Sequence, residues 1–228
     1  MKTPLQHAVH HSLPVPAILS LLVAVTTLTL LSAEGPVFGT ISARDIIKKV
    51  QEKYEDLNDV VITFTQTVRF KVSRAEQETS GTLYFKKKNK YRIETDQRTV
   101  VTDGKTSWSW TPQNRQVIVS AYKEDSYSMS PERIFLSIPQ DYYAALVGEE
   151  KILSEACYVL KLTPKESGSA RTMKVWVAKN WVIRKVEIVE AGGTVTTYTI
   201  KDVVTDKGIP DSRFEFTPPP GADIIDLR

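Results

Sequence analysis

The chain has very few of the residues that carry most nucleophilic catalysis and metal binding. It contains three histidines among 228 residues, His7, His10 and His11, and a single cysteine, Cys157. All three histidines lie before residue 34, where we predict that an export signal ends. Beyond that point a Ser-His or Cys-His pair, a histidine general base and the usual histidine-containing zinc or iron sites are excluded. We therefore expect a protein that is not an enzyme and that needs no metal or cofactor.

The lone cysteine excludes an internal disulfide as well. Cys157 begins the alternating stretch 157–162, which predicts that its side chain is a small buried hydrophobe. No cysteine follows the predicted signal directly, so we do not expect the protein itself to be lipidated there. The ten glycines are scattered without the spacing of a phosphate-binding loop, which argues against a nucleotide site.

Paired carboxylates are the one catalytic device that this composition leaves available. Glu149-Glu150 and Glu124-Asp125 are adjacent in sequence, whereas glycosidase carboxylates must flank a cleft at a defined separation. Solvated loop charge is the favoured interpretation of both pairs.

Net charge excludes a second class of function. The only charged residue before Glu34 is Lys2, so its removal changes the balance from 30 basic against 27 acidic residues to 29 against 27. Nucleic-acid-binding proteins concentrate Lys and Arg on one face, and a nearly neutral chain gives no sign of this. The one basic run, 86–88 with Lys90, is interpreted as a charged strand end that keeps a sheet edge soluble.

Residues 1–33 resemble an export signal. Lys2 and the histidines make a weakly basic start, residues 18–31 form an uncharged apolar run, and Leu31-Ser32-Ala33 resembles a small-residue cleavage site. Since the run is too short for a comfortable membrane span, we expect cleavage after Ala33 and a single working domain over residues 34–228. An uncleaved anchor is the alternative, because Leu31 is a mediocre residue for its subsite.

The rest of the sequence predicts a mainly β (α+β) fold with one N-terminal helix. Ser42 can cap a helix with Asp45 three residues on, and apolar residues then recur at helical spacing up to Leu57. Period-two alternation follows over 60–70, 83–85 and 91–93, and again over 172–178, 181–189 and 194–204, which indicates antiparallel strands. Residues 122–147 lack clean alternation and favour short helices. A strongly curved sheet or incomplete antiparallel β-barrel is therefore expected, and the pattern leaves open whether its interior is a filled core or a ligand cavity.

Several ordered motifs resemble the periplasmic outer-membrane lipoprotein carrier proteins, the LolA family. Each motif alone is common among proteins. Their combination in this order, along nearly the whole of residues 34–228, is specific for the family. They are Phe64-Thr65-Gln66; Gly81 with Leu83 and Phe85; Asp103-Gly104-Lys105-Thr106-Ser107-Trp108 with Trp110, Pro112 and Gln116; Leu162-Thr163-Pro164-Lys165; and Phe214-Glu215-Phe216-Thr217-Pro218-Pro219 with Gly221.

The resemblance implies a periplasmic chaperone that shelters the acyl chains of lipoproteins in a half-open barrel closed by short helices. Its implied partners are triacylated lipoproteins, an inner-membrane ATP-driven release complex that loads it and an outer-membrane acceptor that unloads it. A monomer without cofactor is expected. A related fold that binds or senses another lipid or glycolipid of the cell envelope is the alternative function.

Three groups of site residues follow from this resemblance. One concave apolar face that binds acyl chains is predicted from Phe64, Leu83, Phe85, Tyr91, Ile93 and Trp108. A lid of short helices over the barrel mouth is predicted from Ile134, Phe135, Leu136 and Ile138. Lys87 stands where the family has an arginine that latches the lid, so it is either a weaker latch that promotes release or a solvated strand-end charge.

Overall fold

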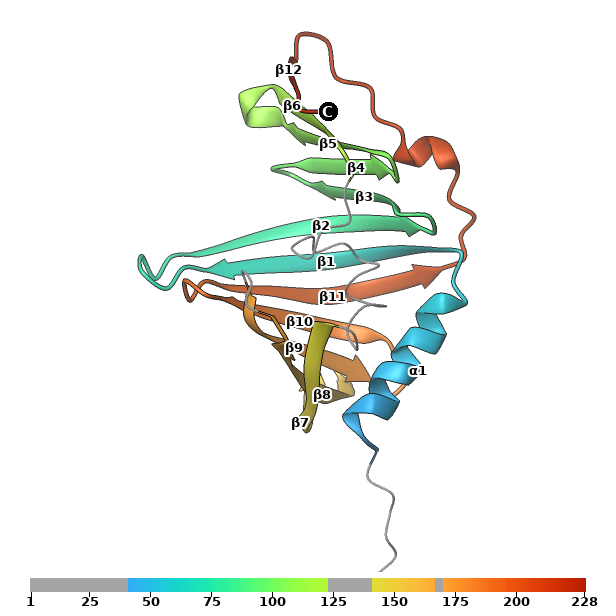
Figure 1. Ribbon diagram of the computed structural model, residues 1–228, viewed down its shortest axis with the longest axis vertical. Coiled ribbons are helices and arrows are strands. Elements are labelled where there is room, and N and C mark those ends of the chain that lie inside the picture. Colours follow the sequence, from blue (N-terminus) through green and yellow to red (C-terminus); the bar gives the residue numbers. More distant parts are fainter. Residues whose placement is uncertain (1–40, 123–140, 167–169) are drawn as a thin grey trace, which may run out of the picture. The chain divides into compact units, whose positions relative to one another are not determined.

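The computed structural model describes residues 41–122, 141–166 and 170–228 (Figure 1). Its single α-helix within these ranges, α1 (Ala43–Glu55), begins where the sequence predicts it. The Ser42 hydroxyl accepts a hydrogen bond from the Asp45 backbone N–H at 3.1 Å, and the Asp45 carboxylate accepts one from the Ser42 backbone N–H at 3.2 Å. This capping box is confirmed, and so is the buried stripe of Ile46, Ile47, Val50 and Tyr54.

Twelve strands form one open sheet in the described part of the chain. Their bounds are β1 (Asp59–Arg69), β2 (Glu76–Lys86), β3 (Lys90–Thr95), β4 (Thr99–Asp103), β5 (Thr106–Thr111), β6 (Gln116–Ala121), β7 (Tyr142–Ile152), β8 (Glu155–Pro164), β9 (Ala170–Ala178), β10 (Ile183–Glu190), β11 (Val195–Thr205) and β12 (Asp223–Asp226). Two short 3₁₀ helices accompany them, η1 (Pro112–Asn114) and η2 (Asp211–Phe214).

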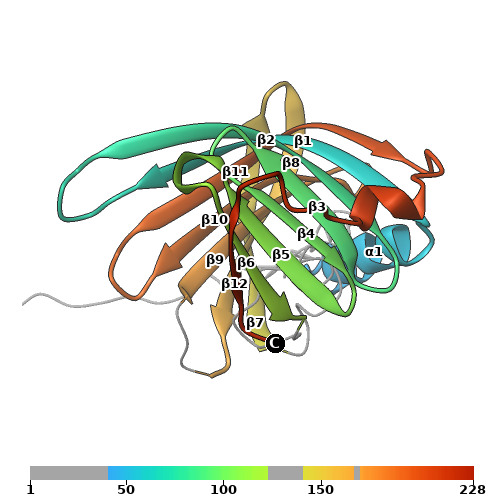
Figure 2. The same ribbon diagram turned by 90° about the horizontal axis from the view of Figure 1, so that it is seen from above.

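The order across the sheet is β12-β6-β5-β4-β3-β2-β1-β11-β10-β9-β8-β7. All neighbours are antiparallel except β12, which pairs with β6 in parallel. Figure 2 shows the sheet curled, with α1 on the side toward which it curls. The expected fold class, a mainly β protein with a strongly curved open sheet and an N-terminal helix, is confirmed.

The main hydrophobic core lies between α1 and the inner face of the sheet, which we define as the face that carries Val60, Ile62 and Phe64. Ile46 and Val50 of α1 belong to the same buried cluster as side chains of β1, β8, β9 and β10. α1 therefore covers one part of the inner face. Leu83 and Phe85 of β2 lie at the edge of this cluster and are only partly buried.

A second set of buried side chains lies on the opposite, outer face. Val101 and Val117 are fully buried there, and Phe214 of η2, which contacts β3 and β4, is buried too. Asp211 of η2 pairs with Lys86 at 2.6 Å and with Lys90 at 2.7 Å. Two lysines of the basic run thus hold the C-terminal segment against the sheet. The sequence had predicted only a charged strand end for this run, without these ion pairs.

Asp59 anchors the start of the C-terminal segment where it leaves β11. Its side chain is buried, and its carboxylate accepts hydrogen bonds from the backbone N–H groups of Lys207, Gly208 and Ile209 at 2.8, 2.9 and 3.1 Å. From this anchor the chain continues to η2 and then to β12, as Figure 1 shows.

One prediction about secondary structure was wrong. The stretch 122–147 was expected to be helical, but its last residues, 142–147, belong to strand β7. β7 is an edge strand whose residues from Tyr143 to Lys151 are exposed, so it has no reason to show the alternation of a half-buried strand. Glu149 and Glu150 lie on this strand and not in a loop, so that expectation was also wrong, while Glu124-Asp125 and the export signal lie outside the described residues.

Two further observations concern Cys157 and the membrane. Cys157 is completely buried, as predicted, and burial raises the pKa of its thiol. No helix in the ranges that the structure describes is both long enough and apolar enough to span a membrane.

Candidate functional site

Five of the six residues predicted to form one apolar face do share the inner face. Residues directly opposite each other in an antiparallel pair point to the same side of the sheet. Leu83 is opposite Ile62 on one side and Ile93 on the other. Phe85 is likewise opposite Val60 and Tyr91. Two apolar rows therefore run across β1, β2 and β3 on the same face as Phe64.

Trp108 does not belong to this face, and its inclusion was wrong. Trp108 is opposite Val101, whereas Ile93 is opposite Val100, the residue before it. Successive residues of a strand point to opposite faces, so Trp108 lies on the outer face. Alternation shows which residues of one strand share a face, but the side-chain orientation of the next hairpin depends on the register that its turn sets.

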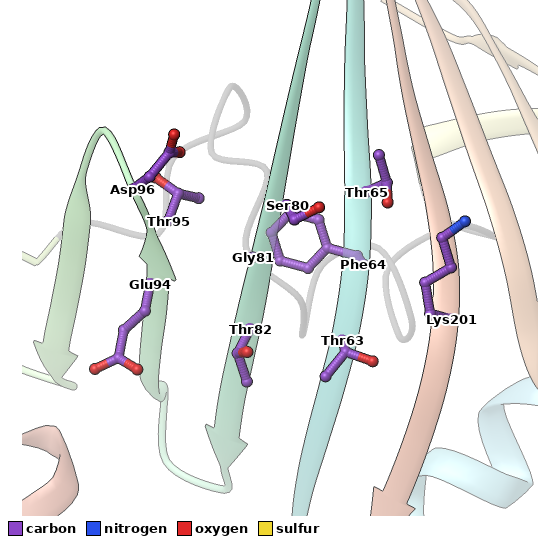
Figure 3. Close-up of a pocket in the computed structure, with 10 residues that line it drawn as sticks. All are labelled: Thr63, Phe64, Thr65, Ser80, Gly81, Thr82, Glu94, Thr95, Asp96 and Lys201. Atoms are coloured by element: carbon purple, nitrogen blue, oxygen red, sulfur yellow. The ribbon is translucent and has the colours of Figure 1, made fainter.

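Phe64 is held in a defined position between two strands. Its ring contacts Tyr198 of β11 edge to face, with 5.9 Å between centroids, and only 8% of the residue is exposed. On the other side its ring crosses to the position of Gly81 on β2 (Figure 3). A Cβ atom at Gly81 would lie 2.6 Å from Phe64 Cζ and 2.8 Å from the Glu94 carbonyl oxygen. Gly81, one of the motif residues, is therefore required by the close approach of this ring and of β3.

Tyr91 ends one apolar row beside another aromatic side chain. Its ring centroid is 6.3 Å from that of Tyr122, in an edge-to-face arrangement. Burial raises the pKa of the Tyr91 phenol to about 12, so the phenol is neutral at physiological pH. Tyr91 therefore adds no charge to this end of the inner face.

The inner face changes from apolar to polar along the strands. Four residues beyond Ile62 on β1, Gln66 is opposite Thr79 of β2 and Tyr198 of β11. The Gln66 amide Nε2 donates a hydrogen bond to the Tyr198 hydroxyl at 3.3 Å. The face is therefore amphipathic in the direction of the strands, with Phe64 and Gly81 at the boundary.

A cavity of about 410 Å³ lies at this polar end. Ile93 and Val100 contribute its apolar lining, and the other lining residues are Gln66, Thr79, Thr95, Gln97, Arg98, Thr111, Gln113 and Tyr198. The volume is within the range of small-molecule sites, roughly 300–1,000 Å³. None of these polar residues was predicted as a site residue, although Gln66 is a motif residue in a strand whose neighbouring inner positions are apolar.

A second hollow, of about 530 Å³, surrounds Phe64 and Gly81 (Figure 3). Apart from these two, its lining consists of hydroxyl, carboxylate and ammonium side chains: Thr63, Thr65, Ser80, Thr82, Glu94, Thr95, Asp96 and Lys201. Thr63, Thr82 and Glu94 are opposite one another on neighbouring strands and lie on the outer face, so this hollow is not on the side of the apolar rows.

Lys87 lies in the turn between β2 and β3 with an exposed side chain. Its backbone N–H donates to the Asn58 carbonyl at 3.3 Å, and its ammonium forms no ion pair with any carboxylate of the described residues. The lid residues Ile134, Phe135, Leu136 and Ile138 lie outside the described residues, so the latch stays a prediction.

Known proteins share the sequence features and the fold. The sequence profile of the family described as outer membrane lipoprotein carrier protein LolA matches residues 55–217. An outer-membrane lipoprotein carrier protein of Pasteurella multocida is 25% identical over 187 residues, which cover 81% of this chain and 88% of that protein. An uncharacterized protein of Methanocaldococcus jannaschii is 30% identical over 198 residues. This match covers 81% of the chain, which spans about half, 54%, of the archaeal protein's length.

A solved structure has a similar fold. The crystal structure of an uncharacterized conserved protein from Thermus thermophilus matches with a TM-score of 0.55 at 13% identity, over 81% of this chain and 98% of that one. Since the family profile matches well over half of the chain, from residue 55 to residue 217, this protein belongs to the outer membrane lipoprotein carrier protein (LolA) family.

Proposed function

We propose that this protein is a periplasmic carrier that binds the acyl chains of lipoproteins on the apolar rows of its inner face and ferries them from the inner to the outer membrane. The observation that carries the proposal is the uneven burial of that face. Val60 and Ile62 of β1 are buried in the core cluster that includes α1, with 0% and 3% exposed. Their neighbours across the sheet, including Leu83, Phe85 and Ile93, are only partly buried.

Partly exposed apolar side chains in an ordered row offer an acyl chain a surface to cover. Each methylene removed from water contributes about 0.8 kcal/mol, so a long chain gains many times the thermal energy by lying along such rows. The neutral Tyr91 phenol at the end of one row imposes no charge on the chain. Binding of this kind needs no catalytic group, consistent with a carrier family and with the lack of histidine after residue 11.

The partners in this proposal are triacylated lipoproteins, the inner-membrane ATP-driven complex that releases them and the outer-membrane acceptor that receives them. Residues 1–33 act as the export signal, and residues 34–228 act as one monomeric carrier domain. Residues 134–138 form the lid, and Lys87 favours release by stabilising the closed, empty state. Each of these roles follows the family pattern.

The alternative, a carrier or sensor of another lipid or glycolipid, is favoured by one observation. The cavity at the polar end of the inner face is lined mostly by amide and hydroxyl side chains, which suit a head group better than an acyl chain. Both functions use the same apolar rows, and they differ in the molecule that occupies them.

Co-purification separates the two functions. The protein would be isolated from a periplasmic extract and its bound molecules identified by mass spectrometry. We expect triacylated lipoproteins with the parent protein and none with Tyr91→Glu, because a carboxylate on the inner face must be desolvated by the bound chain.

Tyr143→Glu is the matched control for this experiment. Tyr143 is 67% exposed on edge strand β7. It is opposite Thr163, whose neighbour Leu162 points to the inner face, so Tyr143 lies on the outer face. The control should retain the lipoproteins. Free lipid in place of lipoprotein would support the alternative, and equal loss from both variants would contradict the role of the inner face.

A further inference from the structure

The cavity at the polar end of the inner face contains one cationic side chain, Arg98. Arg98 belongs to the turn between β3 and β4, which is fixed by three hydrogen bonds. The Thr95 N–H and hydroxyl both donate to the Arg98 carbonyl, at 2.9 and 3.0 Å, and the Arg98 N–H donates to the Thr95 hydroxyl at 3.0 Å. The backbone of Arg98 is therefore held at the cavity.

The charge of Arg98 is not compensated by its neighbours. Its guanidinium forms no ion pair with the carboxylates of residues 41–122, 141–166 and 170–228, whereas Arg92 and Arg213 both pair with Glu94, at 2.6 and 3.4 Å. Glu94 points to the outer face with Tyr84, away from this cavity. Asp96 lines the other hollow and not this one. A guanidinium is charged at every physiological pH, so the cavity has a permanent positive charge.

The remaining polar groups are those that bind an oxyanion. Gln97 and Gln113 line the same cavity and carry amide N–H donors, and Tyr198 carries a hydroxyl. A guanidinium can bind two oxygens of a phosphate or carboxylate side by side. The two apolar rows cross the strands between Phe64 and the beginning of β1, and Val60 is about 13 Å from Phe64 at the ordinary rise of a strand.

From this juxtaposition we infer that the cavity binds the anionic head group, phosphate or carboxylate, of an amphiphile whose acyl chain lies on the apolar rows. Arg98 supplies the charge, and the glutamines and Tyr198 supply the hydrogen bonds. The inference rests on the proposed acyl-binding face and names a further class of ligand, because the acylated cysteine of a triacylated lipoprotein carries no phosphate or carboxylate. It assigns Arg98 a part in selectivity: anionic amphiphiles bind more tightly than neutral ones of the same chain length.

Isothermal titration calorimetry with chain-matched single-chain lipids tests this selectivity. The probes are myristoyl lysophosphatidylglycerol, myristate, neutral monomyristoylglycerol and inorganic phosphate, each below its aggregation concentration at low salt. We expect both anionic lipids to bind about tenfold more tightly than the neutral lipid, the size of one partly exposed charged hydrogen bond. Arg98→Gln should remove this preference without weakening the neutral lipid. Arg44→Gln, an exposed arginine on α1, should leave it intact.

The outcomes separate this inference from the proposed function. Equal affinity of the parent for charged and neutral lipids, or an unchanged preference in Arg98→Gln, would overturn the head-group site while the acyl-chain face stands. Inorganic phosphate that binds as tightly as the lysolipid would also overturn it, because the site would then be one for a free anion. If none of the lipids binds the parent, both the face and the head-group site are refuted. Since Arg98 is exposed, its variant should fold, and circular dichroism verifies this.

Discussion

Replacement of Asp59 by asparagine should destabilise the protein strongly, although the two side chains have nearly the same shape. One carboxylate oxygen accepts from Lys207, and the other accepts from Gly208 and Ile209. An asparagine amide keeps one acceptor oxygen and turns an NH₂ group toward the remaining N–H donors. At least one buried N–H then loses its acceptor. Hydrogen bonds to charged groups contribute roughly 1.5–3 kcal/mol each, so we expect a loss of about 2–4 kcal/mol in the free energy of unfolding.

Urea unfolding at pH 7, followed by tryptophan fluorescence, measures this loss. For a domain of this size the corresponding fall in Tm is roughly 5–15 °C. The exposed Asp202→Asn is the matched control and should change stability by less than about 0.5 kcal/mol. Hydrogen exchange at residues 207–209 should rise in Asp59→Asn before the rest of the sheet is affected. A variant as stable as the control would refute the anchoring role of Asp59.

Three further outcomes are expected. Gly81→Ala should lower the free energy of unfolding by about 1–3 kcal/mol in urea titrations, because its Cβ would meet the Phe64 ring and a backbone oxygen, whereas Gly192→Ala, with open space around it, should be nearly neutral. Lys86 and Lys90 hold the pKa of Asp211 at about 2, so its stabilising contribution is present above the unfolded pKa near 4 and is lost as the pH falls toward 2. The stability difference between the parent and Asp211→Asn should therefore shrink over that interval, and a constant difference would contradict this. Tyr91→Phe should remove one phenol that titrates near pH 12 in ultraviolet spectra and leave acyl binding unchanged, and a titration near pH 10 would contradict the burial of Tyr91.

Local features of the fold could be predicted from the sequence because local interactions determine them. The Ser42 and Asp45 capping box and the helical stripe of α1 depend on residues within one or two turns. Alternation along 60–70 likewise indicated β1, because one face of that strand is buried at its beginning. The many alternating segments with one helix likewise indicated a strongly curved sheet, and the family motifs led to the prediction of an acyl-binding face.

Features that depend on distant contacts could not be predicted in the same way. Trp108 was assigned to the wrong face because its orientation depends on the register of the β4–β5 hairpin. β7 was missed because an exposed edge strand has no buried face to impose alternation. The polar cavity was missed because Gln66, Arg98 and Tyr198 come together only through the pairing of β11 with β1, of β1 with β2 and of β2 with β3. The need for Gly81 became clear only from the position of the Phe64 ring.

The central claim, that acyl chains lie on the inner face, is tested most directly by photo-crosslinking. A benzophenone amino acid would be placed at Ile93 on the inner face and, in a second protein, at Trp108 on the outer face, and each would be irradiated with a lipoprotein labelled in its acyl chains. Ile93 and Trp108 lie on neighbouring parts of the same sheet but on opposite faces. We expect acyl-labelled crosslinks from position 93 and none above background from position 108. Equal crosslinking from the two positions, or crosslinking from position 108 alone, would contradict the assignment of the acyl-binding face.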